Sequence, residues 1–458
     1  MKSTTTDGVP LPQRYGAILA IALGITVAVL DGAIANVALP TIARDLNASA
    51  ATSVWIVNAY QLAITISLLS LASLGDIIGY RKIYLTGLLV FSVTSLGCAM
   101  SDSLWTLTLA RVLQGFGAAA VMSVNVALVR LIYPQRFLGR GMGINALIVA
   151  VSAAAGPSVA AAILSVSSWP WLFAVNVPIG IAAFICGMKF LPENPPKVGK
   201  PKFDGYSALL NALTFGLLIS AISGFAQRQN NLLLLGELII MLIVGTLFVR
   251  RQLNQEFPLL PVDLLRIPIF SLSVGTSICS FTAQMLAFVS LPFFLQTVLG
   301  KTEVMTGLLL TPWPIATMIM APIAGRLLER FNAGLLGSIG LMLFAIGLLS
   351  LALLPSDPTN IDIIWRMALC GAGFGIFQSP NNHTMISSAP RHRSGGASGM
   401  LGTARLLGQT SGAALVALMF NLFGDLGTHS SLLLGALFAL CAAIVSSLRI
   451  RQPKPVSQ

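Results

Sequence analysis

Long apolar runs, separated by short polar segments, occupy almost the whole chain. Each run holds about 20 residues, which is the length at which an α-helix crosses the ~30 Å hydrocarbon layer of a bilayer. The pattern predicts fourteen membrane-spanning helices, at 15–39, 53–74, 83–100, 104–127, 141–165, 172–191, 206–225, 231–251, 268–292, 305–326, 334–354, 362–384, 398–422 and 430–449.

Composition supports an all-α membrane protein. Hydrophobic residues make up 55% of the 458 residues and charged residues 9%, whereas soluble domains carry about 25% charged residues. The mean hydropathy of +0.85 leaves no room for a sizeable soluble domain. The five cysteines lie within apolar runs and lack metal-ligand or redox spacing, so we interpret them as packing residues.

The net charge of +12 is unevenly distributed along the chain, and this orients the helices. With the N-terminus inside, nearly all Lys and Arg residues fall in inside loops and tails, as the positive-inside rule requires. The exceptions are Arg44, Arg228 and Lys301, which fall outside, and Arg111, Arg366 and Arg405, which lie within predicted spans. The distribution therefore predicts that both termini are cytoplasmic, and it argues against nucleic acid as a partner.

Two cytoplasmic loops follow one plan and indicate an internal repeat. The segments 72–82 and 325–332 each place Leu two residues after a small residue, an acid (Asp76 or Glu329) four residues after it, and Gly79 or Asn332 three residues beyond that acid. Repeated halves around a midplane site are a common plan of transporters. The domain organisation predicted from this repeat is a tail 1–14, a six-helix bundle 15–191, a linker 192–205, two inserted helices 206–251, a second six-helix bundle 252–449 and a tail 450–458.

Several motifs, in order, carry a family resemblance. They are the loop 72–82, the segment 109–117, the pair Gly156-Pro157, and the segments 30–40 and 169–180. The chain resembles the fourteen-span drug:proton antiporters of the major facilitator superfamily. Ala33 stands where that family usually has a threonine, and Ala160-Ala161 where it has two glycines. The resemblance implies two six-helix bundles, a small-molecule substrate, a proton gradient as the energy source and no cofactor.

Only two acids lie well inside predicted spans, Asp31 and Glu237. At a rise of 1.5 Å per residue, Asp31 and Arg111 both lie roughly 11–12 Å below the outer surface. They can meet if their helices are neighbours, as the resemblance implies. We expect Asp31 to bind and release the coupled proton, with Arg111 and Gln114 adjusting its affinity. The alternative is a structural ion pair that never titrates.

Other candidates carry weaker signals, each with a structural alternative. Asp76, Gly79, Arg81, Glu329 and Arg330 are predicted to form a cytoplasmic gate latch, or else only helix caps and topology signals. Gly156 and Pro157 form either a hinge that limits leak or a static kink.

The substrate cavity is expected to be aromatic with few hydrogen-bonding groups. Its candidate residues are Asn36, Tyr60, Gln61, Phe281, Gln284, Trp313 and Phe374, although aromatic residues in spans more often pack or face lipid. Arg405 and Glu237 are further charges within spans, each interpreted as more often structural than functional.

These features together predict a proton-coupled efflux antiporter of the bacterial cytoplasmic membrane, acting as a monomer. The expected substrates are amphipathic cations or neutral compounds, since an acid and aromatic rings suit such molecules. A dedicated exporter of one metabolite, or an uptake symporter, is the alternative. The sequence contains no Walker loop, no zinc-ligand spacing and no nucleophile elbow, so an ATP-driven pump, a metalloenzyme or another membrane enzyme is not expected.

Overall fold

The computed structural model describes residues 8–193, 203–226, 229–255, 258–355, 357–390 and 393–451. Within these residues, fourteen helical segments are long and apolar enough to cross a membrane, which confirms the all-α membrane fold. Most of the linker predicted at 192–205, half of the tail 1–14 and nearly all of the tail 450–458 lie outside the described residues.

Some spans consist of two helices in line. The first half of the chain contains α1 (Leu11–Asp45), α2 (Ala50–Ser53) followed by α3 (Trp55–Ile78), α4 (Tyr80–Ala99), α5 (Leu104–Ile132), α6 (Leu138–Leu164), and α7 (Pro170–Ala174) followed by α8 (Asn176–Phe190). Next come α9 (Gly205–Ala226), α10 (Asn231–Leu253) and the short η2 (Val262–Arg266). The second half contains α11 (Pro268–Phe293) continued by the π-turn η3 (Phe294–Val298), α12 (Glu303–Leu310) followed by α13 (Pro312–Leu327), α14 (Ala333–Ala352), α15 (Asn360–Ser388), α16 (Ser394–Phe423) and α17 (Gly427–Leu448).

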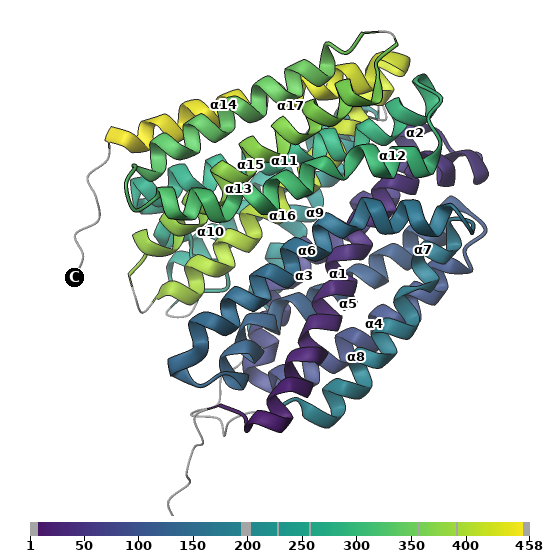
Figure 1. Cartoon of the computed structure of the whole chain (residues 1–458). Coiled ribbons are helices and arrows are strands. Elements are labelled where there is room, and N and C mark those ends of the chain that lie inside the picture. The colour runs from purple at the N-terminus through teal and green to yellow at the C-terminus, as the bar shows by residue number, and fades with distance from the viewer. Residues whose placement is uncertain are drawn as a thin grey trace, which may run out of the picture.

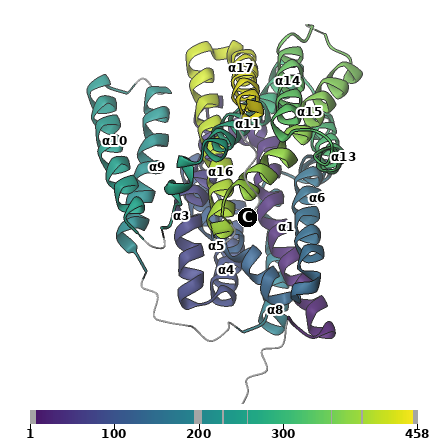
Figure 2. The same cartoon turned by 90° about the vertical axis from the view of Figure 1, so that its left-hand side faces the viewer.

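The helices form two groups. Figure 1 shows α1–α8 as one group and α11–α17 as the other, with the ribbons closest at the end that holds α2, α7 and α12. The groups diverge towards the end that holds the start of α1 and the end of α17. Figure 2 shows α9 and α10 standing to one side. There α9 packs on α3 and α16, and α10 packs on α9.

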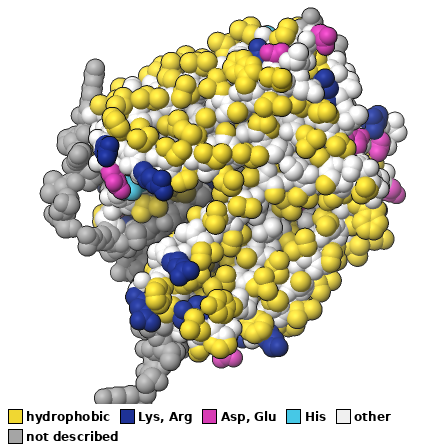
Figure 3. All heavy atoms as spheres, in the orientation of Figure 1, with side chains coloured by type: hydrophobic (Ala, Val, Ile, Leu, Met, Phe, Trp, Pro, Cys, Tyr) yellow, Lys and Arg dark blue, Asp and Glu magenta, His cyan; other side chains and the backbone are white. Residues whose placement is uncertain are grey.

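The surface matches a bilayer environment. In Figure 3, hydrophobic side chains cover the flanks of both groups, and charged side chains gather at the ends. The most exposed span is α10, because only 6% of its most apolar window is buried within the protein. Apolar helix surface of this kind is stable only against lipid.

Helix boundaries follow local chemistry. Pro12 lies in the first turn of α1, where its missing N–H costs nothing because that turn has no acceptor for it. Gly79 ends α3 and begins α4 with φ 111°, a conformation that a residue with a Cβ rarely adopts. The segment predicted as a loop at 72–82 is thus helical except at Gly79, and the one-residue turn between α3 and α4 requires this glycine.

Candidate functional site: a buried charge pair in the first helix group

The structure brings Asp31 of α1 and Arg111 of α5 together in the interior of the first group. The Arg111 guanidinium donates a hydrogen bond to one Asp31 carboxylate oxygen, Oδ2, through Nη1. The Asp31 side chain is 1% exposed and the Arg111 side chain is fully buried. Asp31 and Arg111, which the sequence places at equal depth, therefore form a buried pair between α1 and α5.

Two amides complete the shell around the carboxylate. Asp31 Oδ1 accepts hydrogen bonds from Gln114 Nε2 at 3.0 Å and from Asn176 Nδ2 at 2.7 Å. Gln114 also donates to Ser95 Oγ at 2.8 Å, and its Oε1 accepts from Arg111 Nη1 at 2.6 Å. Every group around Asp31 is a donor, and these donors match the acceptor atoms of a carboxylate.

Arg111 is held from several sides. Its Nε donates to the Ile56 carbonyl at 3.2 Å, and its guanidinium lies 4.0 Å from the centroid of the Tyr60 ring. The Phe173 ring lies 5.5 Å away on another side. Within the described part of the chain, Arg111 Nη2 has no hydrogen-bond partner. The two N–H groups of Nη2 are therefore buried and unpaired among the described residues.

Asn176 and Ser95 were not predicted as members of this site. Asn176 belongs to the segment 169–180 that carries part of the family resemblance, so its position in a motif was a usable signal. Ser95 gave no such signal, because a serine in a span usually bonds its own helix, as Ser95 also does to the Phe91 carbonyl at 2.7 Å.

Gly156 packs against α1 within the first group, and the next residue, Pro157, lies at a close seam between α6 and α12 of the second group. A Cβ on Gly156 would come within 2.4 Å of Ala33 Cβ in α1, so no larger side chain fits there. On the same helix, the Pro157 carbonyl oxygen lies 2.4 Å from where a Cβ on Gly307 of α12 would stand. Ser158 Oγ and Thr311 Oγ1 are 2.9 Å apart across this seam. The predicted hinge is thus also the place where α6 contacts the second group.

Further polar contacts join the groups at the same end. Thr41 of α1 donates to Glu303 Oε1 at 2.7 Å, and Gln296 Nε2 donates to the Val37 carbonyl at 2.9 Å. Arg44 Nη2 lies 3.6 Å from Glu303 Oε1. This end, predicted to face outward, is closed by both backbone packing and hydrogen bonds.

Each charged residue of the predicted gate latch has its own surroundings. Asp76 is exposed and accepts a hydrogen bond from Tyr80 Oη at 2.6 Å, while Arg81 donates to the Met188 carbonyl. Glu329 and Arg330 are exposed at the end of α13. Asp76 and these two residues form no ion pair within the described part of the chain, so a latch joining the groups is not engaged here.

The residues predicted for the cavity do not form one continuous wall. Phe281, Phe374 and Trp313 belong to a buried chain of aromatic rings within the second group, where Phe281 and Phe374 pack edge to face at 5.3 Å. Trp313 extends that chain through the intervening Phe344 ring. Tyr60 belongs instead to the charge site. Of the amides, Gln61 and Asn36 are buried and Gln284 is half-buried.

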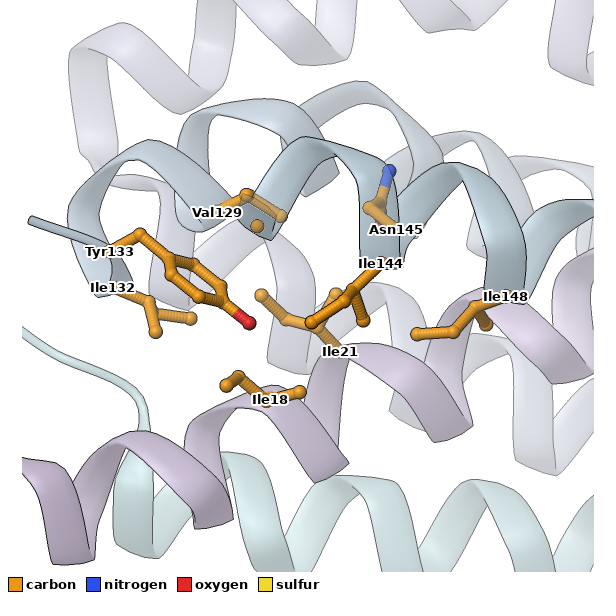
Figure 4. Close-up of a pocket in the computed structure, with 9 residues that line it drawn as sticks. Ile18, Ile21, Val129, Ile132, Tyr133, Ile144, Asn145 and Ile148 are labelled. Atoms are coloured by element: carbon orange, nitrogen blue, oxygen red, sulfur yellow. The ribbon is translucent and has the colours of Figure 1, made fainter. Parts of the chain in front are cut away.

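A separate small pocket lies between the inner ends of α1, α5 and α6. It holds about 240 Å³ of space, part of it open to the surface, and is lined mainly by isoleucines and Val129, with Tyr133 and Asn145 supplying the polar atoms (Figure 4). None of the seven predicted cavity residues lines it. Its apolar lining gives it no evident chemistry.

The remaining charges within spans have different surroundings. Glu237 of α10 accepts from Ser220 Oγ of α9 at 3.5 Å, and its Oε2 is buried without a partner among the described residues. Arg405 of α16 lies over the Phe281 ring at 5.6 Å. Arg449 lies just beyond α17, and the charge pattern assigned it to the inside loops and tails. In the structure its side chain is buried. Its side chain donates to Ser273 Oγ at 3.0 Å and Asn381 Oδ1 at 2.6 Å, and burial lowers the pKa of its guanidinium to about 10.

Comparisons with known proteins agree with this architecture. The family model described as Major Facilitator Superfamily matches residues 21–413. The chain is 69% identical to YebQ of Escherichia coli K12, a transporter described as uncharacterized, with 99% of each chain covered. It is 30% identical to the riboflavin transporter RibZ of Clostridioides difficile (90% of this chain, 89% of the relative) and 30% identical to the multidrug efflux pump LfrA of Mycolicibacterium smegmatis (92% and 84%).

Solved structures share the fold. A bacterial homologue of the human lysosomal transporter Spinster, crystallised in an inward-facing and unoccupied conformation, superposes with a TM-score of 0.71 at 16% identity over 97% of this chain and 98% of that one. The chain is therefore a multi-pass integral membrane protein of the major facilitator superfamily, a transporter and not an enzyme.

Proposed function

We propose that the protein is a proton-coupled antiporter that exports amphipathic small molecules across the bacterial cytoplasmic membrane by alternating access. The observation that carries this proposal is the buried carboxylate of Asp31, because it is the one titratable acid inside the first helix group among the described residues. A chargeable group at membrane depth is costly, by ~2.5–3.5 kcal/mol on insertion scales, and it usually serves transport.

The arrangement supports a simple cycle. In the state described here the outward end is closed and Asp31 is paired with Arg111. A proton arriving from outside neutralises Asp31, and the Arg111 guanidinium then loses its counter-charge. Because α1 also carries Thr41 and packs on α11 and α12, a change at Asp31 reaches the contacts between the groups directly. Release of the proton inside restores the pair.

The two helix groups would be the moving halves in this cycle. Support comes from how the groups meet. They are in contact through small residues and single hydrogen bonds at one end, and they diverge at the other (Figure 1). The pair α9 and α10 stands outside both groups, and α9 packs on one helix of each, α3 and α16. Both termini are placed in the cytoplasm by the charge distribution, and a monomer suffices for the cycle.

The relatives offer two substrate ranges. LfrA is named a multidrug efflux pump, which supports export of several compounds. RibZ is named a riboflavin transporter, which supports the alternative of a single dedicated compound.

Accumulation of fluorescent compounds in cells overproducing the protein tests the proposal. The panel contains ethidium, a quaternary ammonium dye and fluorescein, each with and without a protonophore. We expect at least one compound to be excluded by the cells, and the protonophore to abolish this exclusion. Exclusion that survives the protonophore would rule out proton coupling, and equal accumulation of every compound would favour a dedicated exporter.

A further inference from the structure

Arg405 is a membrane-embedded cation without a counter-charge. It lies near the middle of α16 and is half-buried, with its guanidinium carbon 5.6 Å from the centroid of the Phe281 ring. Among the described residues it has neither a hydrogen-bond partner nor a carboxylate within ion-pair distance. Arg111, by contrast, is neutralised by Asp31.

Contacts along α16 show which way Arg405 faces. One side of the helix meets α3, where Thr410 Oγ1 lies 3.0 Å from Thr65 Oγ1. The opposite side meets α11, where Thr282 Oγ1 donates to the Gly408 carbonyl at 3.1 Å. At 100° per residue, Arg405 lies on the arc between these two sides. Its side chain therefore points into the angle between α3 and α11, where the two helix groups face each other.

The interface between the groups consequently carries an unbalanced positive charge. Among the described residues of the helices that meet there, Asp31 is the only carboxylate away from a helix end, and its charge is cancelled by Arg111. The side-chain amide of Gln409, one turn further along α16 from Arg405, also lacks a hydrogen-bond partner among the described residues. Unpaired donors beside an aromatic ring suit an acidic, ring-bearing ligand.

We infer that Arg405 binds the acid group of the transported compound, and that the substrates are aromatic carboxylates. This inference rests on the proposed export function and changes the charge of substrate expected from the sequence. The planar guanidinium can donate two parallel hydrogen bonds to a carboxylate. Phe281, over whose ring the guanidinium lies, packs against the apolar body of the ligand, and the Gln409 amide bonds a remaining polar atom.

The charge of the substrate sets how much charge each cycle moves. When one proton enters and one monovalent cation leaves, the exchange is electrically neutral. When one proton enters and one carboxylate leaves, two positive charges move inward. A negative potential inside therefore drives export of a carboxylate more strongly than export of a cation.

Ligand-dependent melting of the purified full-length protein tests the inference, because a ligand that binds the folded state raises the melting temperature. The probes are ten aromatic carboxylic acids, including naphthoates and anthracene carboxylates, each paired with its neutral methyl ester. The variants are Arg405→Gln, Arg405→Lys, and Arg366→Gln as a control for loss of another arginine within a span. Arg366 pairs with Asp362 near the outer end of α15.

We expect acids to stabilise the wild type and the Arg366→Gln variant, and the esters to have no effect. Arg405→Gln should weaken binding of the acids at least tenfold while its melting temperature without ligand stays close to that of the wild type, and Arg405→Lys should retain part of the binding. Stabilisation by esters that is unchanged in Arg405→Gln, or no stabilisation by any acid, would overturn the inference.

Transport assays separate this inference from the proposed function. Proton-coupled export of a cation that Arg405→Gln leaves unchanged would contradict the carboxylate site at Arg405 but would agree with the proposed antiport. If acids bind through Arg405 but are transported into or out of proteoliposomes without any proton movement, the proposed antiport is contradicted and the carboxylate site at Arg405 is supported.

Discussion

At the residue scale, the carboxylate of Asp31 is fixed by donors from two other helices, α5 and α8. Arg111 and Gln114 come from α5, and Asn176 begins α8, while Ser95 of α4 holds Gln114 in place. The sequence predicted Asp31 and Arg111 because both are charged and lie at equal depth. The motif around Asn176 marks that residue as a candidate, but neither its contact with Asp31 nor the role of Ser95 follows from the sequence, because both depend on how α4 and α8 pack against α1 and α5.

Removing one member of the pair should destabilise the protein more than removing both. Arg111→Gln leaves the buried Asp31 charge without its partner, a change that costs about 3–5 kcal/mol of unfolding free energy at such sites. In the double variant Asp31→Asn/Arg111→Gln, two neutral amides replace the pair, and most of that loss should be recovered. Thermal unfolding in detergent measures both variants. A double variant no more stable than Arg111→Gln would mean that the two charges do not stabilise each other.

At the element scale, the predicted spans correspond to helices, and the differences lie at their ends. The first predicted span, 15–39, is shorter than α1 (Leu11–Asp45), because helices continue beyond the hydrocarbon layer and hydropathy does not register their polar ends. The same limit explains Arg449, which the charge pattern placed in a loop but which packs against α11 and α15. Hydropathy predicts spans, whereas burial at their ends depends on tertiary contacts.

The seam between α6 and α12 should not tolerate a branched side chain. A Val at Gly307 would meet the Pro157 carbonyl and Ala161, so Gly307→Val should wedge the outer end open. We expect a cysteine placed at Ser158, in a background without native cysteines, to react several-fold faster with an impermeant maleimide added from outside. Gly275→Val is the control, because a Cβ at Gly275 meets nothing within 4 Å. Equal labelling rates in the two variants would show that the seam does not close the outer end.

The inner ends of α9 and α10 are joined through Asp204, directly before α9. Its carboxylate accepts hydrogen bonds from the Ser207 backbone N–H and from Arg251 Nη2, both at 3.0 Å. Partial burial alone would raise the pKa of this carboxyl, but the hydrogen bonds from Arg251, Ser207 and Gln255 outweigh it and hold the pKa well below its usual range. The ionised form therefore stabilises the folded protein.

Loss of this carboxylate should have a modest effect that depends on pH. Because a depressed pKa contributes stability above the unfolded value of about 3.9, Asp204→Asn should destabilise the protein equally at pH 7 and pH 5. The difference should shrink as the pH falls below about 4. Since the pair with Arg251 is partly exposed, we expect less than about 1 kcal/mol. Melting curves at pH 7, 5 and 3 measure this, and a difference that grows towards pH 3 would contradict the assignment.

At the scale of the whole molecule, the all-helical fold and its fourteen spans follow from the sequence, because apolar runs of this length have few other solutions in a bilayer. The wall of the substrate cavity does not follow in the same way. Trp313 and Phe374 are as aromatic as Tyr60, but they are buried inside the second group, while Tyr60 covers Arg111. Residue type alone does not reveal which face of a helix turns towards the other group.

The proposed cycle, and the function proposed for the site around Asp31, both require that Asp31 carries the exchanged proton. The most direct measurement is proton movement in proteoliposomes that contain a pH-sensitive dye, after addition of the compound that cells exclude most strongly. We predict that the compound drives proton exchange in the wild type and in Asp31→Glu, and that Asp31→Asn lowers the exchange at least tenfold while still binding the compound. Exchange by Asp31→Asn at the wild-type rate would contradict the account.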